Sequence, residues 1–399
     1  MNRPMSSPCR ISDEGVRLDL IRREPRQRYV LHVAGPAPVP RPAIRAMDSS
    51  SPTPPTDASK SGRPKVAARS TGNLTLDDVS KLAGVSPITV SRALNHPELV
   101  ASETLAAIRR VVTETGYVPN LLAGGLASNR SRLVAAIIPT LGNAMFIDTM
   151  QPLNDMLAQQ DYRLVLGLSG FPRADEDELL KGMLSRRPDA LVLTGVRHSS
   201  STRLRLRAAR IPIVEIWDLT PEPLDLVVGF SHVRVGGAAA LHLYGKGYRR
   251  FASVCAHDER ARVRHAAFVN TLGEHGINLE SMHEVQTPTT VRMGRESFAR
   301  VFNEGSRPEV IFCSSDVLAH GLLAEAQSRG LKVPDDVAVM GFADLDFAAY
   351  TFPALTTVHV DRGAIGRMAG EMLLARLDGK IIESPVVDVG FHIVDRASA

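Results

Sequence analysis

With 399 residues, of which 44% are hydrophobic and 23% charged, the chain has the composition of an ordinary globular protein with two or three domains. No run approaches the roughly 18 consecutive apolar residues of a membrane span, so we expect no membrane partner. The three cysteines have neither disulfide-framework nor metal-ligand spacing, which excludes folds built on either, and we expect Cys255 and Cys313 to be buried thiols.

Residues 1–73 are the first region in chain order, and they hold 11 prolines and a net charge of +7. Residues 74–132 carry only +1 and the remainder −4. Because so polar and proline-rich a segment buries too little apolar surface to offset chain entropy, we predict a disordered basic tail. Either the start of translation is assigned too far upstream, with Met47 as the alternative start, or the tail is a basic arm that contacts DNA phosphates. It shows no apolar core of a secretory signal, which favours a cytoplasmic protein.

Residues 74–95 indicate two short helices joined by a tight turn. Thr75 can cap the first helix, with Asp78 three residues later as its capping-box partner. Gly84 stands where the chain leaves this helix, because glycine enters the left-handed region at little cost. The apolar face that we expect to pack inward consists of Val79, Leu82 and Ala83.

The second helix begins after Ser86, a capping residue, and its first residue Pro87 needs no amide partner at that position. We expect its inward side to hold Val90, Ala93 and Leu94. The outward side then presents Ile88, Thr89, Ser91 and Arg92. Two amphipathic helices with a glycine turn also occur as plain structural elements, but the arrangement matches a helix-turn-helix, whose second helix enters the major groove of DNA.

A third helix is predicted from Ser102 to Thr115, and Gly116-Tyr-Val-Pro-Asn120 follows it. This region closely resembles the LacI family of bacterial transcriptional regulators. The resemblance rests on the string Thr-Leu-Asp-Asp-Val-Ser-Lys-Leu-Ala-Gly-Val-Ser-Pro-Ile-Thr-Val-Ser-Arg-Ala-Leu-Asn, on the third helix and on Gly-Tyr-Val-Pro-Asn. The resemblance covers residues 74–396. It implies a helix-turn-helix DNA-binding domain over 74–119, with double-stranded operator DNA as its partner. The residues that it implies at the DNA are Thr75, Ser86, Pro87, Ile88, Thr89, Ser91, Arg92, Asn95, Asn120, Leu126 and Ala127.

The resemblance also implies a hinge helix and linker over 120–132, which forms on DNA and inserts Leu126 into the minor groove. Gly124 and Gly125 lie inside this segment, and each costs a helix about 1 kcal/mol relative to alanine. A helix of about eight residues is also too short to be stable alone. We therefore expect the hinge to fold only on DNA.

From Leu133 onward strands alternate with helices, which is the pattern of parallel α/β sheets. Strands are predicted over 133–138, 163–168, 190–194, 213–216, 226–230, 251–255, 283–285, 310–313, 337–342 and 356–360. Helices are predicted over 146–159, 176–185, 202–210, 232–244, 260–275, 291–304, 316–329 and 364–377. The expected fold class is α/β: a small all-α helix-turn-helix headpiece and, over 133–399, a two-lobed core of two doubly wound parallel sheets that resembles periplasmic binding proteins. Effectors should bind in the crevice where the strands end, and the lobes should also form the dimer contacts.

Arg264 heads Arg264-His-Ala-Ala-Phe268, which matches a family motif whose arginine clamps hydroxyls or a carboxylate of the effector. Ala267 stands in place of a glycine. The planar guanidinium suits this task because its donors can engage two oxygens at once. A solvated arginine at a helix start is the alternative.

Other residues on loops or strand ends could also reach the crevice: Asn143, Phe146, Arg197, His198, Trp217, Asp218 and Phe230. Trp217, the only tryptophan, either offers a face to a sugar ring or belongs to the core of a lobe. Ser315-Asp316 and Asp344 stand where relatives often carry Asn-Asp and Gly-Tyr-Asp-Asp, with Ala343 in place of one acid. The expected effector-binding set is Asn143, Phe146, Arg197, Trp217, Arg264, Ser315, Asp316 and Asp344.

Several strings resemble one subgroup of the family, the repressors of gluconate operons. They are Leu193-Thr194 with His198, Ile213-Val-Glu215, Asp218 and Leu224-Asp-Leu-Val-Val-Gly-Phe230. Ala343 fits this subgroup and argues against a plain neutral-sugar pocket. A sugar acid would suit Arg197 or Arg264, because a pocket with fewer acids repels a carboxylate less.

The sequence contains no P-loop, GxGxxG, GxSxG or HExxH pattern, so we expect neither an enzyme nor a bound cofactor or metal. A transport-type sugar-binding protein shares the two-lobed fold, but it would carry a signal peptide and no helix-turn-helix. The sequence therefore predicts a DNA-binding regulator, a repressor of a carbohydrate or sugar-acid catabolic operon under control of a small-molecule effector. It would act as a homodimer or tetramer.

Overall fold

The computed structural model describes residues 74–118, 130–171 and 176–399. The predicted tail over 1–73 lies outside the described residues, as does the hinge segment up to residue 129. Among the helices that are described, none has the length and hydropathy needed to cross a bilayer.

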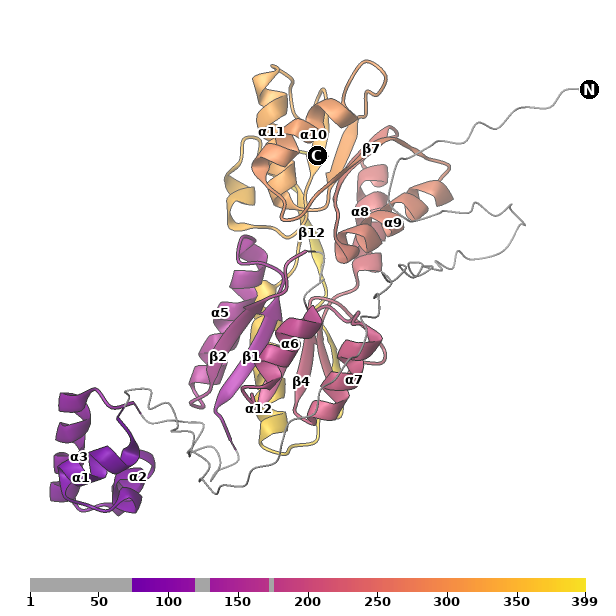
Figure 1. Ribbon diagram of the computed structural model, residues 1–399. Helices are drawn as coiled ribbons and strands as arrows, with labels where there is room; N and C mark the ends of the chain where they lie inside the picture. Colours follow the sequence, from indigo (N-terminus) through magenta and orange to yellow (C-terminus); the bar gives the residue numbers. More distant parts are fainter. Residues whose placement is uncertain (1–73, 119–129, 172–175) are drawn as a thin grey trace, which may run out of the picture. The chain divides into compact units, whose positions relative to one another are not determined.

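Three helices and one 3-10 turn form the headpiece (indigo in Figure 1): α1 Leu76–Ala83, α2 Pro87–Asn95, η1 Pro97–Leu99 and α3 Ser102–Thr115. The predicted start and stop signals are confirmed. Thr75 and Asp78 form a capping box at α1, and Ser86 caps α2. Gly84 ends α1 with a φ of 67°, in the left-handed region that a residue with a Cβ enters only with strain.

The core of the headpiece consists of Val79, Val90, Ala93, Ile108 and Tyr117. The predicted inward side of α1 is wrong at one position, because Leu82 is 60% exposed. Leu76, Val79 and Ala83 stand three, four and seven residues apart and share the side that packs inward. Leu82 falls outside that spacing relative to Leu76 and therefore turns toward solvent.

The first lobe of the core contains a six-stranded sheet in the order β11-β5-β4-β3-β1-β2, with every neighbouring pair parallel. Its strands are β1 Leu133–Ile138, β2 Arg163–Leu168, β3 Ala190–Thr194, β4 Ile213–Ile216, β5 Leu226–Gly229 and β11 Val386–Asp388. Its helices are α5 Ala144–Ala158, α6 Glu176–Leu184, α7 Ser200–Ala209 and α12 Arg362–Leu377.

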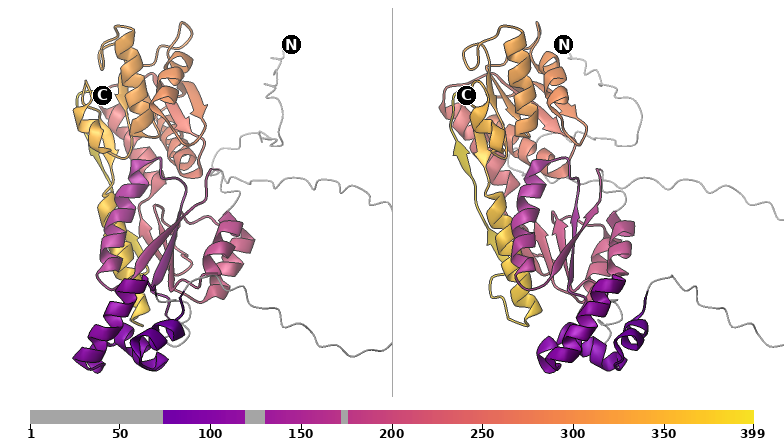
Figure 2. Two further views of the ribbon diagram at one scale, coloured as in Figure 1. Left: turned by 60° about the vertical axis from the view of Figure 1, so that its left-hand side comes forward. Right: turned by 90° about the vertical axis from the view of Figure 1, so that its left-hand side faces the viewer.

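Alternation along β1 explains how this sheet is covered on both faces. Val134, Ala136 and Ile138 pack with residues of α5 and α12, whereas Ala135 and Ile137 pack with α6 and α7. Successive side chains of a strand point to opposite faces, so an unbroken apolar run requires helices on both. Figure 2 shows α5 and α12 lying side by side along one face of this sheet.

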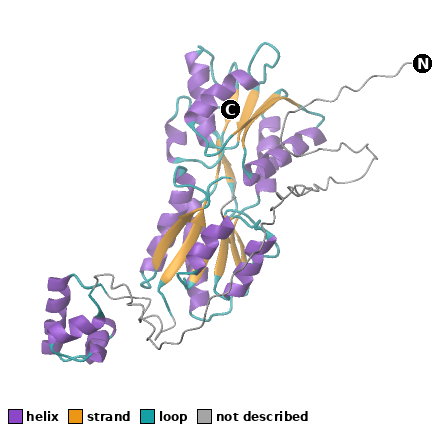
Figure 3. Cartoon of the chain, in the orientation of Figure 1, coloured by secondary structure: helices purple, strands orange, loops and turns teal. Residues whose placement is uncertain are grey.

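The second lobe repeats the arrangement with a four-stranded parallel sheet in the order β7-β6-β8-β9. Its strands are β6 Phe251–Ala256, β7 Leu279–Val285, β8 Val310–Cys313 and β9 Ala338–Met340. The helices α8 His232–Gly245 and α9 Glu259–Glu274 cover one face, and α10 Val291–Val301 and α11 Asp316–Ser328 cover the other. Both sheets are thus doubly wound, as predicted (Figure 3). Cys255 and Cys313 are buried free thiols, also as predicted.

The C-terminal part of the chain connects the two lobes. After β9, the 3-10 helix η2 Asp346–Tyr350 leads to β10 Thr357–His359, which pairs antiparallel with β12 His392–Val394. Between these two strands, α12 packs in the first lobe and β11 adds an edge strand beside β5. Neither β11 nor β12 was predicted, and the predicted strand over 356–360 belongs to this connection.

The strand order fixes where a ligand site belongs. In each sheet the order reverses beside the first strand, since β1 lies between β2 and β3 and β6 lies between β7 and β8. Open α/β sheets bind ligands outside the carboxyl ends of their strands at such a point. The loops after β1, β3, β6 and β8 are therefore the expected walls of a site.

Candidate functional site

The exposed side of α2 is the first candidate site. Ser86 Oγ accepts a hydrogen bond from the Thr89 N–H at 3.2 Å and lies 2.8 Å from Thr89 Oγ1. Pro87 follows as the first helical residue, Ile88 is 70% exposed, and Arg92 is exposed one turn later. The first turn of α2 thus lies open to solvent at the positive end of the helix dipole, which suits a DNA surface.

The other predicted DNA-binding residues lie around this helix. Thr75 sits at the start of α1, where its N–H donates to Asp78 Oδ2 at 2.9 Å; hydrogen bonds from Thr75 lower the pKa of the Asp78 carboxyl. Asn95 ends α2, and its Nδ2 donates to the Ser91 carbonyl oxygen at 2.9 Å. Asn120, Leu126 and Ala127 lie outside the described residues.

The second candidate site is a cavity of about 40 Å³, partly open to solvent, where loops of both lobes meet. The first lobe lines it with Thr140, Asn143, Met145, Phe146, Phe171 and Trp217. The second lobe lines it with His232, Ala256, Asp258, Arg260, Arg264, Thr287, Pro288, Thr289, Ser314 and Ser315. Most of these residues follow the carboxyl ends of strands, where open α/β sheets bind ligands.

Arg264 is a buried cation in the wall of this cavity. Its Nη1 donates to His232 Nδ1 at 3.0 Å and its Nη2 donates to the Ser314 carbonyl oxygen at 3.0 Å. The Phe342 ring lies 3.7 Å from the guanidinium carbon. Burial lowers the pKa of Arg264 to about 10, so the side chain stays charged at neutral pH. The Nε atom finds no hydrogen-bond partner among the described residues, which leaves one buried donor for a ligand oxygen.

Trp217 is held in the same wall by two hydrogen bonds. Its backbone has a φ of 70°, its Nε1–H donates to Thr149 Oγ1 at 3.1 Å, and its carbonyl oxygen accepts from His232 Nε2 at 2.8 Å. Burial, and then the charges of Arg264 and Arg260, hold the pKa of His232 well below its usual value. His232 is therefore neutral, with its proton on Nε2, and links the tryptophan of one lobe to the arginine of the other.

Five of the eight residues expected to bind an effector come together in this cavity: Asn143, Phe146, Trp217, Arg264 and Ser315. Trp217 is fully buried in the hydrophobic core of the first lobe, which is the second of the two alternatives left open by the sequence, and it borders the cavity from there. Arg197 does not line it but pairs with Glu259 of the other lobe, with Nη1 2.9 Å from Oε1.

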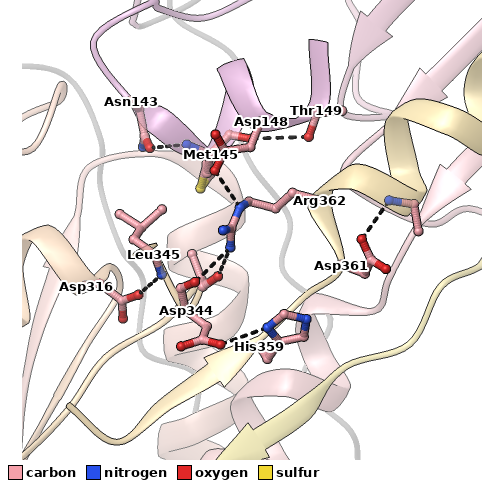
Figure 4. Close-up of polar contacts among 12 residues, drawn as sticks. Asn143, Met145, Asp148, Thr149, Asp316, Asp344, Leu345, His359, Asp361 and Arg362 are labelled. Atoms are coloured by element: carbon pink, nitrogen blue, oxygen red, sulfur yellow. Dashed lines mark hydrogen bonds and ion pairs between the residues drawn. The ribbon is translucent and has the colours of Figure 1, made fainter. Parts of the chain in front are cut away.

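Asp316 and Asp344 lie outside the cavity lining, and their carboxylates are engaged within the protein (Figure 4). Asp316 Oδ1 accepts from Thr357 Oγ1 at 2.6 Å and its Oδ2 accepts from the Leu345 N–H at 2.7 Å. Asp344 pairs with Arg396 at 2.8 Å and with His359 at 2.9 Å. These two acids hold the loop after β9 in place, and a contact of either with an effector stays a prediction.

Arg362 joins the same loop to the first lobe (Figure 4). It stands at the start of α12, and its Nε donates to Asp148 Oδ2 on α5 at 3.0 Å. Its Nη1 donates to the carbonyl oxygens of Ala343 and Asp344. The side chain thus bridges the two lobes at the connecting segment, where a change in lobe orientation would alter its hydrogen bonds.

Sequence reasoning missed Arg260 and His232 as cavity residues. Arg260 stands four residues before Arg264 on α9, and i,i+4 residues share one side of a helix. That spacing was a usable signal, because placing Arg264 in the crevice places Arg260 beside it. His232 carried no comparable signal, since its role depends on contacts with Trp217 and Arg264 that are distant in sequence.

His198, which the sequence also placed near the crevice, instead lies in a buried ionic cluster. Its Nδ1 is 3.1 Å from Glu176 Oε1 and its Nε2 is 3.2 Å from Glu215 Oε1. Burial lowers the pKa of His198, but the two carboxylates outweigh burial and raise it overall. The cluster anchors the loop that carries Arg197. In the described part of the chain no group of His, Cys, Asp and Glu side chains is arranged to hold a metal ion.

Two family models match the chain in its two regions. Residues 75–120 match the bacterial regulatory proteins of the lacI family, and residues 240–399 match the periplasmic binding protein-like domain. The first match covers the headpiece, and the second covers the half of the core that contains Arg260 and Arg264.

Individual relatives match over most of the chain. The HTH-type transcriptional regulator GntR of Pseudomonas aeruginosa is 38% identical over 333 residues, which cover 83% of this chain and 97% of that protein. The regulator GntR of Escherichia coli K12 is 31% identical over 80% of this chain and 96% of its own length. The crystal structure of a LacI-family transcriptional regulator from Silicibacter pomeroyi superposes with a TM-score of 0.77 at 33% identity, covering 82% of this chain and 99% of that one.

Proposed function

Because the chain belongs to the LacI family of bacterial regulatory proteins, we propose that it represses an operon for sugar-acid catabolism and that a sugar acid releases it from DNA. It is a transcriptional regulator with an N-terminal DNA-binding domain and a C-terminal effector-binding domain. The proposal concerns the class of effector, the residues that hold it and the assembly that acts. Its place of action would be the cytoplasm, where the operator is.

The observation that carries the effector proposal is the charged wall of the cavity. Arg264 is buried there with a donor that lacks a partner, and Arg260 is buried beside it. The neutral hydroxyls and amide around them, such as those of Thr140 and Asn143, suit the hydroxyl groups of a sugar chain. A carboxylate gains charge-assisted hydrogen bonds from guanidinium groups that a neutral sugar end does not.

For DNA binding we propose that α2 enters the major groove with its first turn. Ser86, Thr89 and Arg92 provide the polar contacts on the exposed side, and Ile88 provides an apolar one. Pro87 offers no hydrogen bond, so reading near it would rest on shape and on thymine methyl groups.

We propose a homodimer that presents two such helices to a pseudo-palindromic operator. Two large aromatic side chains, Tyr350 at the end of η2 and Phe352 just after it, are 83% and 85% exposed. Exposed aromatic side chains this close together are unusual on a monomer surface and favour a protein contact.

Effector and operator would be coupled through the two lobes. The cavity is lined by both lobes, and Arg362 bridges them at the connecting segment. A ligand that fits one lobe arrangement better than the other shifts the balance between them, and the shift equals its differential affinity.

The test uses the full chain and an operator that the protein itself selects from random-sequence DNA. Operator affinity is measured by fluorescence anisotropy with and without D-gluconate, for the wild type and for Arg264→Gln. We expect gluconate to weaken operator binding of the wild type and to leave Arg264→Gln bound. Arg262→Gln is the matched control, because Arg262 lies on the same helix, outside the cavity, and pairs with Glu284. Operator binding that no sugar acid changes would refute the proposed effector class.

A further inference from the structure

His232 stands between two groups in the wall of the cavity, the Trp217 carbonyl and the Arg264 guanidinium. It is the first residue of α8 and is buried. Its Nε2 lies 2.8 Å from the Trp217 carbonyl oxygen, and its Nδ1 lies 3.0 Å from Arg264 Nη1. Resting on the proposed function, we propose that His232 is a positioning residue, which fixes the guanidinium of Arg264 in the orientation that binds the effector.

The Trp217 carbonyl determines which nitrogen of His232 carries the proton. A neutral imidazole has one N–H donor and one acceptor nitrogen. A carbonyl oxygen can only accept, so the contact with Trp217 requires the proton on Nε2. Nδ1 is then an acceptor, which is what an N–H of the Arg264 guanidinium needs. Burial, and then the charges of Arg264 and Arg260, lower the pKa of His232, so this tautomer stays neutral at neutral pH.

The backbone at Trp217 is held in the geometry that supplies this carbonyl. Its φ of 70° lies in the left-handed region, which a bulky residue adopts only where surrounding contacts enforce it. Gly229 on β5 leaves room for the turn, because a Cβ there would lie 2.2 Å from the Asp218 carbonyl oxygen. The Trp217 N–H also donates to the Val228 carbonyl oxygen at 3.2 Å. The acceptor for His232 is therefore a fixed feature of the first lobe.

Arg264 gains a fixed orientation from this contact because its other contacts restrain only part of the guanidinium. Nη2 donates to the Ser314 carbonyl oxygen at 3.0 Å, and the Phe342 ring covers one face. His232 restrains the second terminal nitrogen, so the plane of the group is set before an effector arrives. The Nε atom, which has no partner among the described residues, is then held at a fixed angle. A donor that is already oriented saves the ligand the cost of ordering it.

Two substitutions separate the two hydrogen bonds of His232. The Oδ1 atom of an asparagine can replace Nδ1 as the acceptor for Arg264, but the side chain is too short to reach the Trp217 carbonyl. A glutamine can donate to that carbonyl, but it places no acceptor where Nδ1 stood. Calorimetry with the full chain is expected to show D-gluconate binding roughly tenfold to a hundredfold more weakly in His232→Gln, the range for a hydrogen bond to a charged group. His232→Asn should weaken it only about threefold.

The order of the two variants distinguishes positioning from packing. Glutamine fills more of the volume of a histidine than asparagine does, so a packing role alone would make His232→Asn the weaker binder. The matched control is His265→Gln, because His265 adjoins Arg264 on α9 but contacts Ser253 Oγ with its Nε2 at 2.8 Å, outside the cavity. Its Kd for gluconate should equal that of the wild type. If His232→Gln does not fold by circular dichroism, His232→Met, which also fills the site without an acceptor, carries the same expectation.

The outcomes also separate this inference from the proposed function. A His232→Gln or His232→Met protein with the wild-type affinity for gluconate overturns the positioning role, and so does a loss in His232→Asn that equals or exceeds the loss in His232→Gln. Gluconate-dependent operator release by the wild type would in each case leave the proposed function standing. A wild type that does not bind gluconate overturns both.

Discussion

Ile88 and Arg92 stand four residues apart on α2 and share the side that faces solvent. One is a large apolar side chain at 70% exposure, which the folded chain alone does not explain, and the other is a cation. An apolar side chain can contact thymine methyl groups and an arginine can contact phosphate or the edge of guanine. Variants of these two residues can therefore distinguish recognition of the base sequence from overall affinity for DNA.

We predict that Arg92→Ala weakens operator binding by roughly 1–3 kcal/mol. Ile88→Ala should instead reduce discrimination against base changes in the half-site, with a smaller loss of affinity for the selected operator. Anisotropy titrations against the operator and its single-base variants give both numbers. Arg110→Ala is the control for lost charge, since Arg110 is exposed on α3; equal losses in Arg92→Ala and Arg110→Ala would contradict the placement of α2 in the groove.

Asp316 carries the second prediction at the level of single residues. Burial raises the pKa of its carboxyl to about 6, although hydrogen bonds from the Thr357 hydroxyl and the Leu345 N–H oppose the rise. In the unfolded chain an Asp titrates near 3.9, so between these values the folded state binds the proton more tightly. The stabilisation from the protonated form is complete below the unfolded value and is lost as pH rises through about 6.

As pH falls from about 7.5 to about 4.5, the free energy of unfolding of the wild type should therefore rise relative to that of Asp316→Asn, by on the order of 2–3 kcal/mol. Thermal melts of both proteins across this range measure it. Asp346→Asn, at an exposed acid nearby, is the control for loss of a carboxylate in this segment. A pH-independent difference for Asp316→Asn would mean that the carboxyl is ionised throughout.

At the level of elements, the contact between α8 and α9 positions the cavity arginines. A Cβ on Gly236 of α8 would lie 2.1 Å from the Arg264 carbonyl oxygen and 2.9 Å from Ala267 Cβ. Backbone cannot yield at such distances without moving the helix, so this glycine permits the close approach. Gly245, at the end of the same helix, has open space around a Cβ.

We predict that Gly236→Ala lowers stability by about 1–3 kcal/mol, as overpacking does, and weakens gluconate binding because α9 must shift at Arg264. Gly245→Ala should be neutral or stabilising by up to about 1 kcal/mol, since alanine favours a helix over glycine. Melting temperatures and calorimetry compare the two. If the two variants have equal stability, the close packing of α8 on α9 is not required.

The same level shows what the sequence could and could not predict. Both ends of β1 were predicted correctly, because polar residues on either side of an unbroken apolar run mark where the strand begins and ends. The strands β11 and β12 were missed because each has only three residues of mixed character, and β11 is defined by pairing with β5, more than 150 residues earlier. Whether a short segment forms a strand depends on the strands that it pairs with, and for β11 and β12 these partners are distant in the sequence.

The cavity residues follow the same rule. Asn143 caps α5 just after a strand, where the fold class already places a crevice, and Arg264 was found by its resemblance to a family motif. Asp316 and Asp344 also stand at strand ends, but Thr357, Leu345 and Arg396 engage their carboxylates from distant parts of the sequence. Only tertiary contacts decide which acid at a strand end faces a ligand and which one holds a loop.

For the whole molecule, effector response requires two arrangements of the lobes with different operator affinities. Arg362 contacts α5 in one lobe and the loop after β9 in the other, and Arg197 pairs with Glu259 across the lobes. Ion pairs as exposed as Arg197–Glu259 contribute little by themselves. Under the proposed function, the response would come from the ligand's own differential affinity for the two arrangements.

The last prediction concerns the dimer. Tyr350→Ser combined with Phe352→Ser should convert a dimer to a monomer in sedimentation analysis, because the loop loses its two exposed aromatic side chains. Operator affinity should then fall by roughly a hundredfold or more, since joining two headpieces makes the second contact intramolecular and adds avidity of about 10²–10⁴. The affinity for gluconate should stay within about threefold of the wild-type value, because the cavity residues all come from one chain. Ile381→Ser, at a single exposed apolar residue, is the control for lost surface hydrophobicity. A double variant that remains dimeric would place the interface elsewhere on the lobes, and one that turns monomeric yet keeps full operator affinity would remove the need for paired headpieces.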